Sequence, residues 1–171
     1  MNAKRVYLDT SVVIVLLFGR EKEPERYASV QRLFEGIDAG QIAGLVSVYT
    51  VQEVCLFCRE HFSEQVPEQV AALALRALFQ HDLRLVPLIT RAEKLAHVRG
   101  FEMHDAADRP HAIAAYVNRC DAIVAYDEHF EDIADKLSYL QPEALLTELE
   151  AASDQIPSVE DATSGQGSPF A

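Results

Sequence analysis

A single acidic residue, Asp9, interrupts the apolar segment RVYLDTSVVIVLLFG near the start of the chain. The residues before it, 6–8, are β-branched, aromatic and aliphatic, which is typical of a buried strand. The residues after it, 10–18, are apolar on nearly every side, which indicates a buried helix that begins near Thr10 or Ser11. A buried carboxylate is costly unless it is paired or binds a metal. The fold must therefore compensate the charge of Asp9.

The rest of the chain alternates between predicted strands and predicted helices. We expect strands at 42–48, 83–89 and 120–127, and a short fifth strand at 137–142. The predicted helices span 24–40, 50–62, 67–81, 90–104, 107–119 and 142–151. This alternation favours an α/β fold with three layers (α/β/α) and a mainly parallel central sheet of four to five strands. Ligands of such sheets bind beyond the carboxyl ends of the strands, where Asp9 and Asp127 fall.

Two of these helices have predicted start signals. Thr50 and Glu53 have the spacing of a capping box, so the second of the listed helices is expected to begin at Thr50. Asp108 is predicted to be the N-cap of the helix at 107–119, with Pro110 tolerated in its first turn. Both signals place an acidic residue near the beginning of a helix.

Chain length and composition predict one globular domain followed by a tail. The chain has 171 residues, of which 49% are hydrophobic, enough for a sizeable core. From Ala151 onward the sequence is rich in Ser, Gly, Pro, Asp and Gln, which favours disorder. We therefore expect a domain at 1–150 and a disordered C-terminal tail at 151–171.

The charge balance argues against nonspecific nucleic-acid binding. The chain carries 15 Lys and Arg residues against 27 Asp and Glu residues, for a net charge of −12. Contacts to phosphate groups must therefore be local. An odd count of three cysteines without a secretory context predicts no disulfide framework. The apolar run at 12–18 is far shorter than the ~20 residues that span a bilayer. We expect a cytoplasmic protein with no membrane contact.

Four short acidic motifs follow one another along the chain. They are Asp9-Thr10-Ser11, Glu53 after Ser47 and Thr50, Asp108 with His111, and Asp127 with Phe130. The pattern resembles the PIN-domain family over roughly residues 4–150, and within that family it resembles the VapC-like toxins of VapBC toxin–antitoxin modules. Taken singly, Asp9, Glu53 and Asp127 are each explained by helix capping or a turn. Their joint occurrence in this order favours a functional site.

The resemblance implies a metal-dependent endoribonuclease that uses Mg²⁺ or Mn²⁺ and an activated water to hydrolyse RNA phosphodiester bonds. It assigns Asp9, Asp108 and Asp127 as metal ligands and Glu53 as a ligand or as the holder of a metal-bound water. Thr10 and Ser11 would hydrogen-bond a carboxylate or a substrate phosphate. General chemistry agrees, because hard divalent cations prefer oxygen ligands and keep clustered carboxylates ionised.

The resemblance also implies partners: an RNA substrate, an antitoxin protein and a second copy of the chain in a homodimer. Two alternatives stay open, a stand-alone RNA-processing nuclease and a catalytically inactive PIN-like module that binds RNA or protein. The inactive alternative rests on Ala125, which replaces the hydroxyl residue that many family members carry there, and on the net charge. Asp105 competes with Asp108 as the third acid, and the spacing of Asp108 to His111 and Asp127 favours Asp108.

Overall fold

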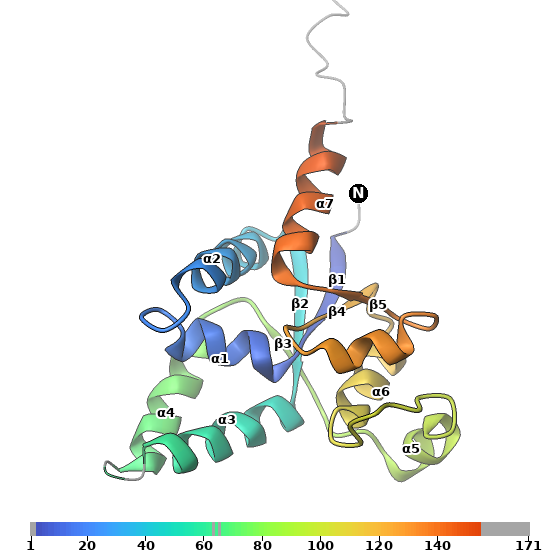
Figure 1. Cartoon of the computed structure of the whole chain (residues 1–171), viewed down its shortest axis with the longest axis horizontal. Coiled ribbons are helices and arrows are strands. Elements are labelled where there is room, and N and C mark those ends of the chain that lie inside the picture. Colours follow the sequence, from blue (N-terminus) through green and yellow to red (C-terminus); the bar gives the residue numbers. More distant parts are fainter. Residues whose placement is uncertain (1–2, 63, 65, 155–171) are drawn as a thin grey trace, which may run out of the picture.

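A five-stranded sheet forms the centre of the computed structural model, which describes residues 3–62, 64 and 66–154 (Figure 1). The strands are β1 (Lys4–Leu8), β2 (Ile42–Ser47), β3 (Arg84–Val86), β4 (Ala122–Val124) and β5 (Ser138–Leu140). Their order is β3-β2-β1-β4-β5, and each neighbouring pair is parallel. The prediction of an α/β fold with a parallel sheet of four to five strands is confirmed.

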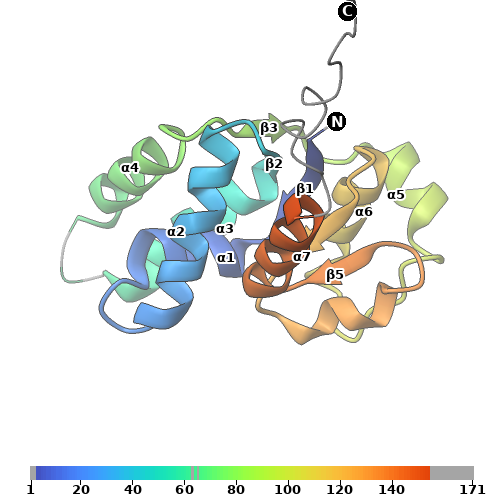
Figure 2. The same ribbon diagram turned by 90° about the horizontal axis from the view of Figure 1, so that it is seen from above.

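Helices cover both faces of this sheet (Figures 1 and 2). They are α1 (Thr10–Phe18), α2 (Pro24–Asp38), α3 (Val48–His61), α4 (Pro67–Leu78), α5 (Arg91–His97), α6 (Arg109–Val117), the short 3₁₀ helix η1 (Glu128–Ile133) and α7 (Pro142–Asp154). Figure 2 shows α1 to α4 gathered on one side of β1, with α5 and α6 on the other. The three layers α/β/α are therefore present.

The alternation of side chains along β1 explains why the sheet is buried on both faces. Val6 and Leu8 pack into one core with α1, α2 and α4, while Tyr7 packs into a second core with α6 and η1. All three side chains are completely buried. A central parallel strand has no solvent face, so it consists of large apolar side chains in an unbroken run. The central position of β1 places Asp9, the next residue, in the middle of the carboxyl edge.

Two glycines fit α2 closely against β2. Gly40 has φ of +70°, a left-handed conformation that ends α2 and that glycine adopts without strain. At Gly44 a Cβ atom would lie 2.7 Å from Ile37 Cδ1 and 2.9 Å from Leu83 Cδ2. The missing side chain therefore leaves room for the helix to approach the strand.

Several predicted helix boundaries are wrong, among them the start of α3 and the end of α5. The structure begins α3 at Val48, with Ser47 as the N-cap whose Oγ accepts from the backbone N–H of Tyr49, so Thr50 and Glu53 do not form a capping box. The helix predicted over 90–104 ends as α5 at His97, and Gly100 lies in the turn that follows. A glycine at that point favours a helix end, so the apolar residues beyond it do not continue the helix.

The C-terminal helix is longer than predicted, since α7 continues through residues 151–154. The remainder of the predicted disordered tail, 155–171, lies outside the described residues. Within the described part of the chain, no helix has the length and apolar character needed to cross a membrane.

Candidate active site

The carboxyl edge of the sheet gathers acidic side chains from four different elements. Asp9 directly follows β1, and Asp127 lies three residues beyond β4. These strands are parallel neighbours, with Leu8 paired to Val124, so both residues leave the sheet at the same edge. Asp108 precedes α6, and Glu53 lies in α3. The site is therefore built from segments that are far apart in the sequence.

Asp9 is held by the residues that follow it. It is only 6% exposed, and its Oδ2 accepts hydrogen bonds from the Ser11 backbone N–H at 2.8 Å and from Ser11 Oγ at 2.7 Å. Ser11 Oγ also accepts from the backbone N–H of Tyr126 at 3.0 Å. This hydroxyl therefore joins the end of β1 to the segment after β4, and the other oxygen, Asp9 Oδ1, lies 3.8 Å from His111 Nδ1.

A buried chain of hydrogen bonds holds Glu53. Thr10 Oγ1 donates to Glu53 Oε2, and His111 Nε2 lies 3.1 Å from Glu53 Oε1. The other ring nitrogen of His111, Nδ1, lies 2.8 Å from the Tyr7 hydroxyl, which in turn lies 2.6 Å from Ser47 Oγ. Because each polar atom in this chain has a partner, the carboxylate of Glu53 is fixed in position against His111, the same ring that contacts Asp9.

The electrostatics of this pair are consistent with an ionised contact. Burial lowers the pKa of His111, but the hydrogen bond to Glu53 and the negative charges of Asp9 and Glu53 raise it above its ordinary value. Burial raises the pKa of Glu53, but the hydrogen bond from His111 and the charge of His111 outweigh burial, so the pKa lies below its ordinary value. A protonated imidazole is therefore favoured next to the carboxylates, which reduces their mutual repulsion.

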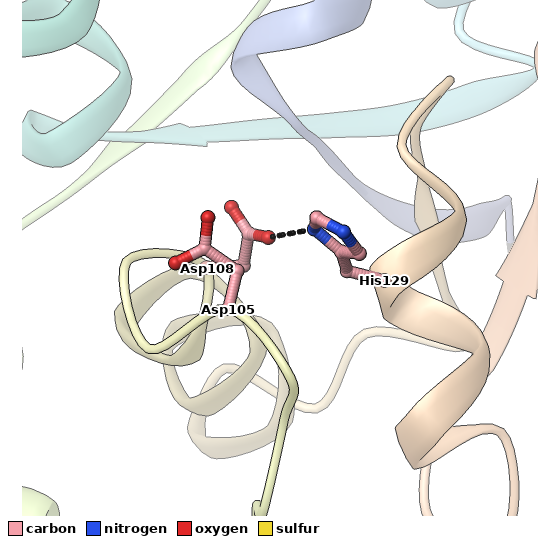
Figure 3. A group of neighbouring side chains, drawn as sticks. All are labelled: Asp105, Asp108 and His129. Atoms are coloured by element: carbon pink, nitrogen blue, oxygen red, sulfur yellow. Dashed lines mark hydrogen bonds and ion pairs between the residues drawn. The ribbon is translucent and has the colours of Figure 1, made fainter.

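Asp108 and Asp127 both contact the same ring nitrogen of His129, and Figure 3 shows the contact with Asp108. His129 Nδ1 is 3.3 Å from Asp108 Oδ2 and 3.1 Å from Asp127 Oδ1. Asp127 also caps η1, because its Oδ1 accepts from the backbone N–H of His129. The N-cap position predicted for Asp108 is confirmed, although its side chain makes no capping hydrogen bond and is free to face the other acids.

Asp105 lies close to both Asp108 and His129. One ligand atom from each of Asp105, Asp108 and His129 lies within 4.8 Å of the others (Figure 3). Asp105 Oδ1 accepts from the backbone N–H of Ala107, so one oxygen of this carboxylate stabilises the loop before α6. Burial raises the pKa of Asp108, and the charges of Asp127, Asp9 and Asp105 all act in the same direction. Asp108 is therefore close to all three of these acids, and the choice of Asp108 over Asp105 as the third ligand stays a prediction.

The charge density of the cluster is visible in Asp108. Burial raises the pKa of this carboxyl group to about 6, and the charges of Asp127 and Asp9 act in the same direction, while the hydrogen bond to His129 opposes them. A group of repelling carboxylates with oxygen donors from three elements suits a hard divalent cation, which would offset the repulsion. The residues present thus fit Mg²⁺ or Mn²⁺.

Replacing Asp108 by asparagine is expected to stabilise the metal-free protein near pH 7.5. The folded protein binds the Asp108 proton more tightly than the unfolded chain does. The free energy of unfolding of the wild-type protein therefore falls as the pH rises from about 4 to about 6, whereas that of the asparagine variant lacks this contribution. After allowance for solvent screening, the asparagine variant should be about 1 kcal/mol more stable at pH 7.5 in EDTA. Urea unfolding followed by circular dichroism at several pH values measures this difference. A difference that does not shrink towards pH 4 contradicts the assignment.

Two residues of this site were not singled out in the sequence. Tyr7 lies inside an apolar strand, and its only signal is a hydroxyl that needs a buried partner. His129 lies between Asp127 and Phe130 in the last acidic motif, where nothing in the pattern distinguishes it from a surface residue. Thr10 and Ser11, predicted as hydrogen-bonding groups, are both found donating to carboxylates.

The chain matches the PIN domain family over residues 5–129. This match covers more than half of the sequence, and the chain belongs to the PIN-domain family. The resemblance inferred from the four acidic motifs is therefore confirmed. No curated protein matches the chain.

Solved structures show the same fold at low sequence identity. A DNA-bound VapBC from Salmonella typhimurium superposes with a TM-score of 0.58 and 16% identity, over 81% of this chain and 98% of that one. VapBC2 from Rickettsia felis, bound to a DNA fragment from its promoter, superposes with a TM-score of 0.55 and 12% identity, over 80% of this chain and 98% of that one. VapC20 from Mycobacterium tuberculosis, a Sarcin-Ricin loop cleaving toxin, superposes with a TM-score of 0.55 and 15% identity, over 78% of this chain and 97% of that one. These likenesses show the fold alone.

Proposed function

We propose that this protein is an endoribonuclease that hydrolyses RNA phosphodiester bonds with the help of Mg²⁺ or Mn²⁺. The observation that carries the proposal is the meeting of Asp9, Asp108 and Asp127 at one edge of the sheet, close enough for two of them to raise the pKa of the third. Such an arrangement is unfavourable without a cation and useful with one. Membership of the PIN-domain family supports the same conclusion.

In this proposal each acidic residue has its own role. Asp9, Asp108 and Asp127 ligate the cation, and Glu53, held by Thr10 and His111, is a ligand or orients the attacking water. The bound cation supplies Lewis-acid stabilisation of the phosphodiester and activation of a water molecule. His111 keeps the Glu53 carboxylate ionised and aimed at the site. The hydroxyl of Ser11 is occupied by Asp9 and the Tyr126 backbone, so other groups bind the substrate phosphate.

Metal binding should be measurable without any RNA. Mn²⁺ or Mg²⁺ at about one hundred times its dissociation constant is expected to stabilise the protein by about 2.7 kcal/mol. For a chain of this size, that corresponds to a rise of about 5–10 °C in the melting temperature. Purified protein should cleave RNA with either ion and stop in EDTA. Cleavage that persists in EDTA, together with an unchanged melting temperature, would count against the proposal.

The likeness to VapBC and VapC chains suggests a cellular role as the toxin of a toxin–antitoxin pair. In this role the protein is cytoplasmic, and an antitoxin binds it and blocks the acidic site. Expression of the chain alone in bacterial cells should then arrest growth, and expression of an Asp9→Asn variant should not. Rescue by co-expression of the product of the adjacent reading frame would identify the antitoxin. Normal growth with an active enzyme would instead favour a stand-alone RNA-processing nuclease.

We also propose that the protein forms a homodimer. Large apolar side chains are exposed on the neighbouring helices α3 and α4 and just before α4, namely Leu56, Val66 and Leu73, the last of which is 67% exposed. Apolar groups gathered on one surface are typical of protein interfaces. Light scattering after size-exclusion chromatography measures the oligomeric state, and a monomer at micromolar concentration would contradict this proposal.

A further inference from the structure

A second site candidate lies at the opposite end of α6 from Asp108. It is a pocket of about 610 Å³ between α5, α6 and the segment before β5. Its lining includes Glu93, His97, Tyr116, Arg119, Cys120 and Lys136. Since α6 has nine residues, its two ends are separated by about 13 Å. The pocket shares none of the acidic residues at the carboxyl edge and has the volume typical of small-molecule sites.

Two cations in the pocket lack a strong partner. The guanidinium group of Arg119 makes no hydrogen bond or ion pair with any described residue. Lys136 Nζ contacts the carboxylate of the adjacent Asp135 at 3.3 Å, in an exposed pair that contributes little. In a chain with a net charge of −12, an unpaired guanidinium group and a weakly paired ammonium group that line one pocket are a local exception. They favour an anionic ligand.

The acidic residue of the pocket is already engaged elsewhere. Glu93 Oε2 accepts from the backbone N–H and the hydroxyl of Thr90, which completes the capping box of α5. Two further guanidinium groups act on the pocket floor, because burial raises the pKa of Cys120 to about 12, Arg5 and Arg84 oppose that rise, and Asp121 adds to it. Glu93 is therefore not available to neutralise Arg119 or Lys136.

The backbone of Arg119 is strained. Its φ is +56°, and among the described residues it is the one non-glycine residue with a positive φ. The backbone needs this left-handed turn, because the Cys120 N–H bonds to Ala115 O at 3.0 Å and ends α6. Glycine would make the turn without strain, whereas an arginine costs about 1 kcal/mol. The structure thus retains an arginine where the backbone favours glycine, which points to a use for its side chain.

An aromatic surface adjoins these cations. Tyr116 is 44% exposed, and its ring is braced edge-on by His97 and Phe101, each with its ring centre 5.3 Å away. A braced and exposed aromatic ring is suited to stacking with a nucleic-acid base, an interaction worth about 1–3 kcal/mol. Cations for a phosphate and a ring for a base thus line the same pocket.

We propose that this pocket binds a nucleoside monophosphate unit, with its phosphate on Arg119 and Lys136 and its base against Tyr116. A free nucleotide and the phosphorylated 5′ end of an RNA strand carry the same chemistry, so either is a possible source of the ligand. The proposal uses none of the acidic residues at the carboxyl edge and does not depend on ribonuclease activity.

Isothermal titration calorimetry in EDTA tests this binding with adenosine 5′-monophosphate, inorganic phosphate and adenosine as separate probes. The nucleotide should bind once per chain and at least about tenfold more tightly than either fragment. Arg119→Gly should weaken nucleotide binding by at least about tenfold. The same variant should raise the melting temperature by about 2 °C or more, since its backbone strain is relieved. A purely structural role for Arg119 predicts no loss of binding.

One further variant tests the second cation, and two others act as controls. Lys136→Gln should lose affinity in the same way, whereas Lys22→Gln on the turn between α1 and α2 should not. Asp9→Asn should bind the nucleotide as wild type does, which separates this pocket from the acidic site. Comparing a 5′-phosphorylated oligoribonucleotide with the free nucleotide identifies the source of the ligand by the tighter binder. No binding of the nucleotide to wild type, or equal binding to Arg119→Gly, overturns the proposal.

Discussion

Replacing Asp9 by asparagine is expected to reduce the rate of RNA cleavage by more than about a hundredfold. Mutation of a group that only hydrogen-bonds a metal ligand already lowers metal affinity or activity about 10- to 100-fold. Asp9 is one of the three ligands of the proposed cation site, and asparagine removes its negative charge. The melting-temperature rise caused by Mn²⁺ should fall in parallel. Cleavage of a labelled RNA over a range of Mn²⁺ concentrations measures the first effect.

The fold of this variant should be preserved. Asparagine is as good an N-cap as aspartate, so its side-chain oxygen can still accept from the Ser11 backbone N–H at the start of α1. Asp135→Asn is a matched control, because this residue is exposed and its carboxylate contacts Lys136 and none of the four acids of the site. The control should cleave RNA at the wild-type rate. An Asp9→Asn protein that cleaves as fast as wild type would show that the proposed site is wrong.

The Tyr7→Phe variant is expected to unfold more easily, by about 2–4 kcal/mol. The Tyr7 hydroxyl is the common partner of Ser47 Oγ and His111 Nδ1 in a region without solvent access. Its removal leaves the Ser47 hydroxyl with only the Tyr49 backbone N–H and His111 Nδ1 with only the 3.8 Å contact to Asp9 Oδ1. Each buried hydrogen bond lost in this way costs about 1–3 kcal/mol. Urea denaturation followed by circular dichroism measures the change in the free energy of unfolding.

A second tyrosine provides the comparison for this experiment. The Tyr27 hydroxyl makes no hydrogen bond with the described residues, although its ring packs against the same apolar core as α1. Tyr27→Phe should therefore change the free energy of unfolding by less than about 0.5 kcal/mol. If the two variants lose similar stability, the hydrogen-bonded chain from Ser47 to Glu53 contributes little.

The sheet was predictable from the sequence because its strands are nearly continuous apolar runs. Val6–Leu8 and the segment before Asp127 carry this pattern, and the following acids mark where each strand ends. The acidic residues were also predictable as a group, since parallel strands bring their carboxyl ends to one edge. Hydrophobic patterning and topology together were sufficient for this part of the site.

The contacts that orient the site depend on the tertiary structure. Glu53 had the spacing of a capping-box partner, but three-dimensional packing places it against His111 and Thr10 instead. The competition between Ser47 and Thr50 for the start of α3 is decided by the end of β2, which ends at Ser47. Local sequence rules do not include such distant partners. They therefore located the acids without describing how each carboxylate is held.

The last strand has a consequence for how the domain can be shortened. The family match ends at residue 129, before β5 and α7, yet Leu145 of α7 is completely buried in the core and β5 pairs along the whole of β4. A chain cut at that boundary would turn the apolar strand Ala122–Val124 into an open edge, which is a template for aggregation. Truncated versions for crystallisation or expression should therefore retain residues through α7.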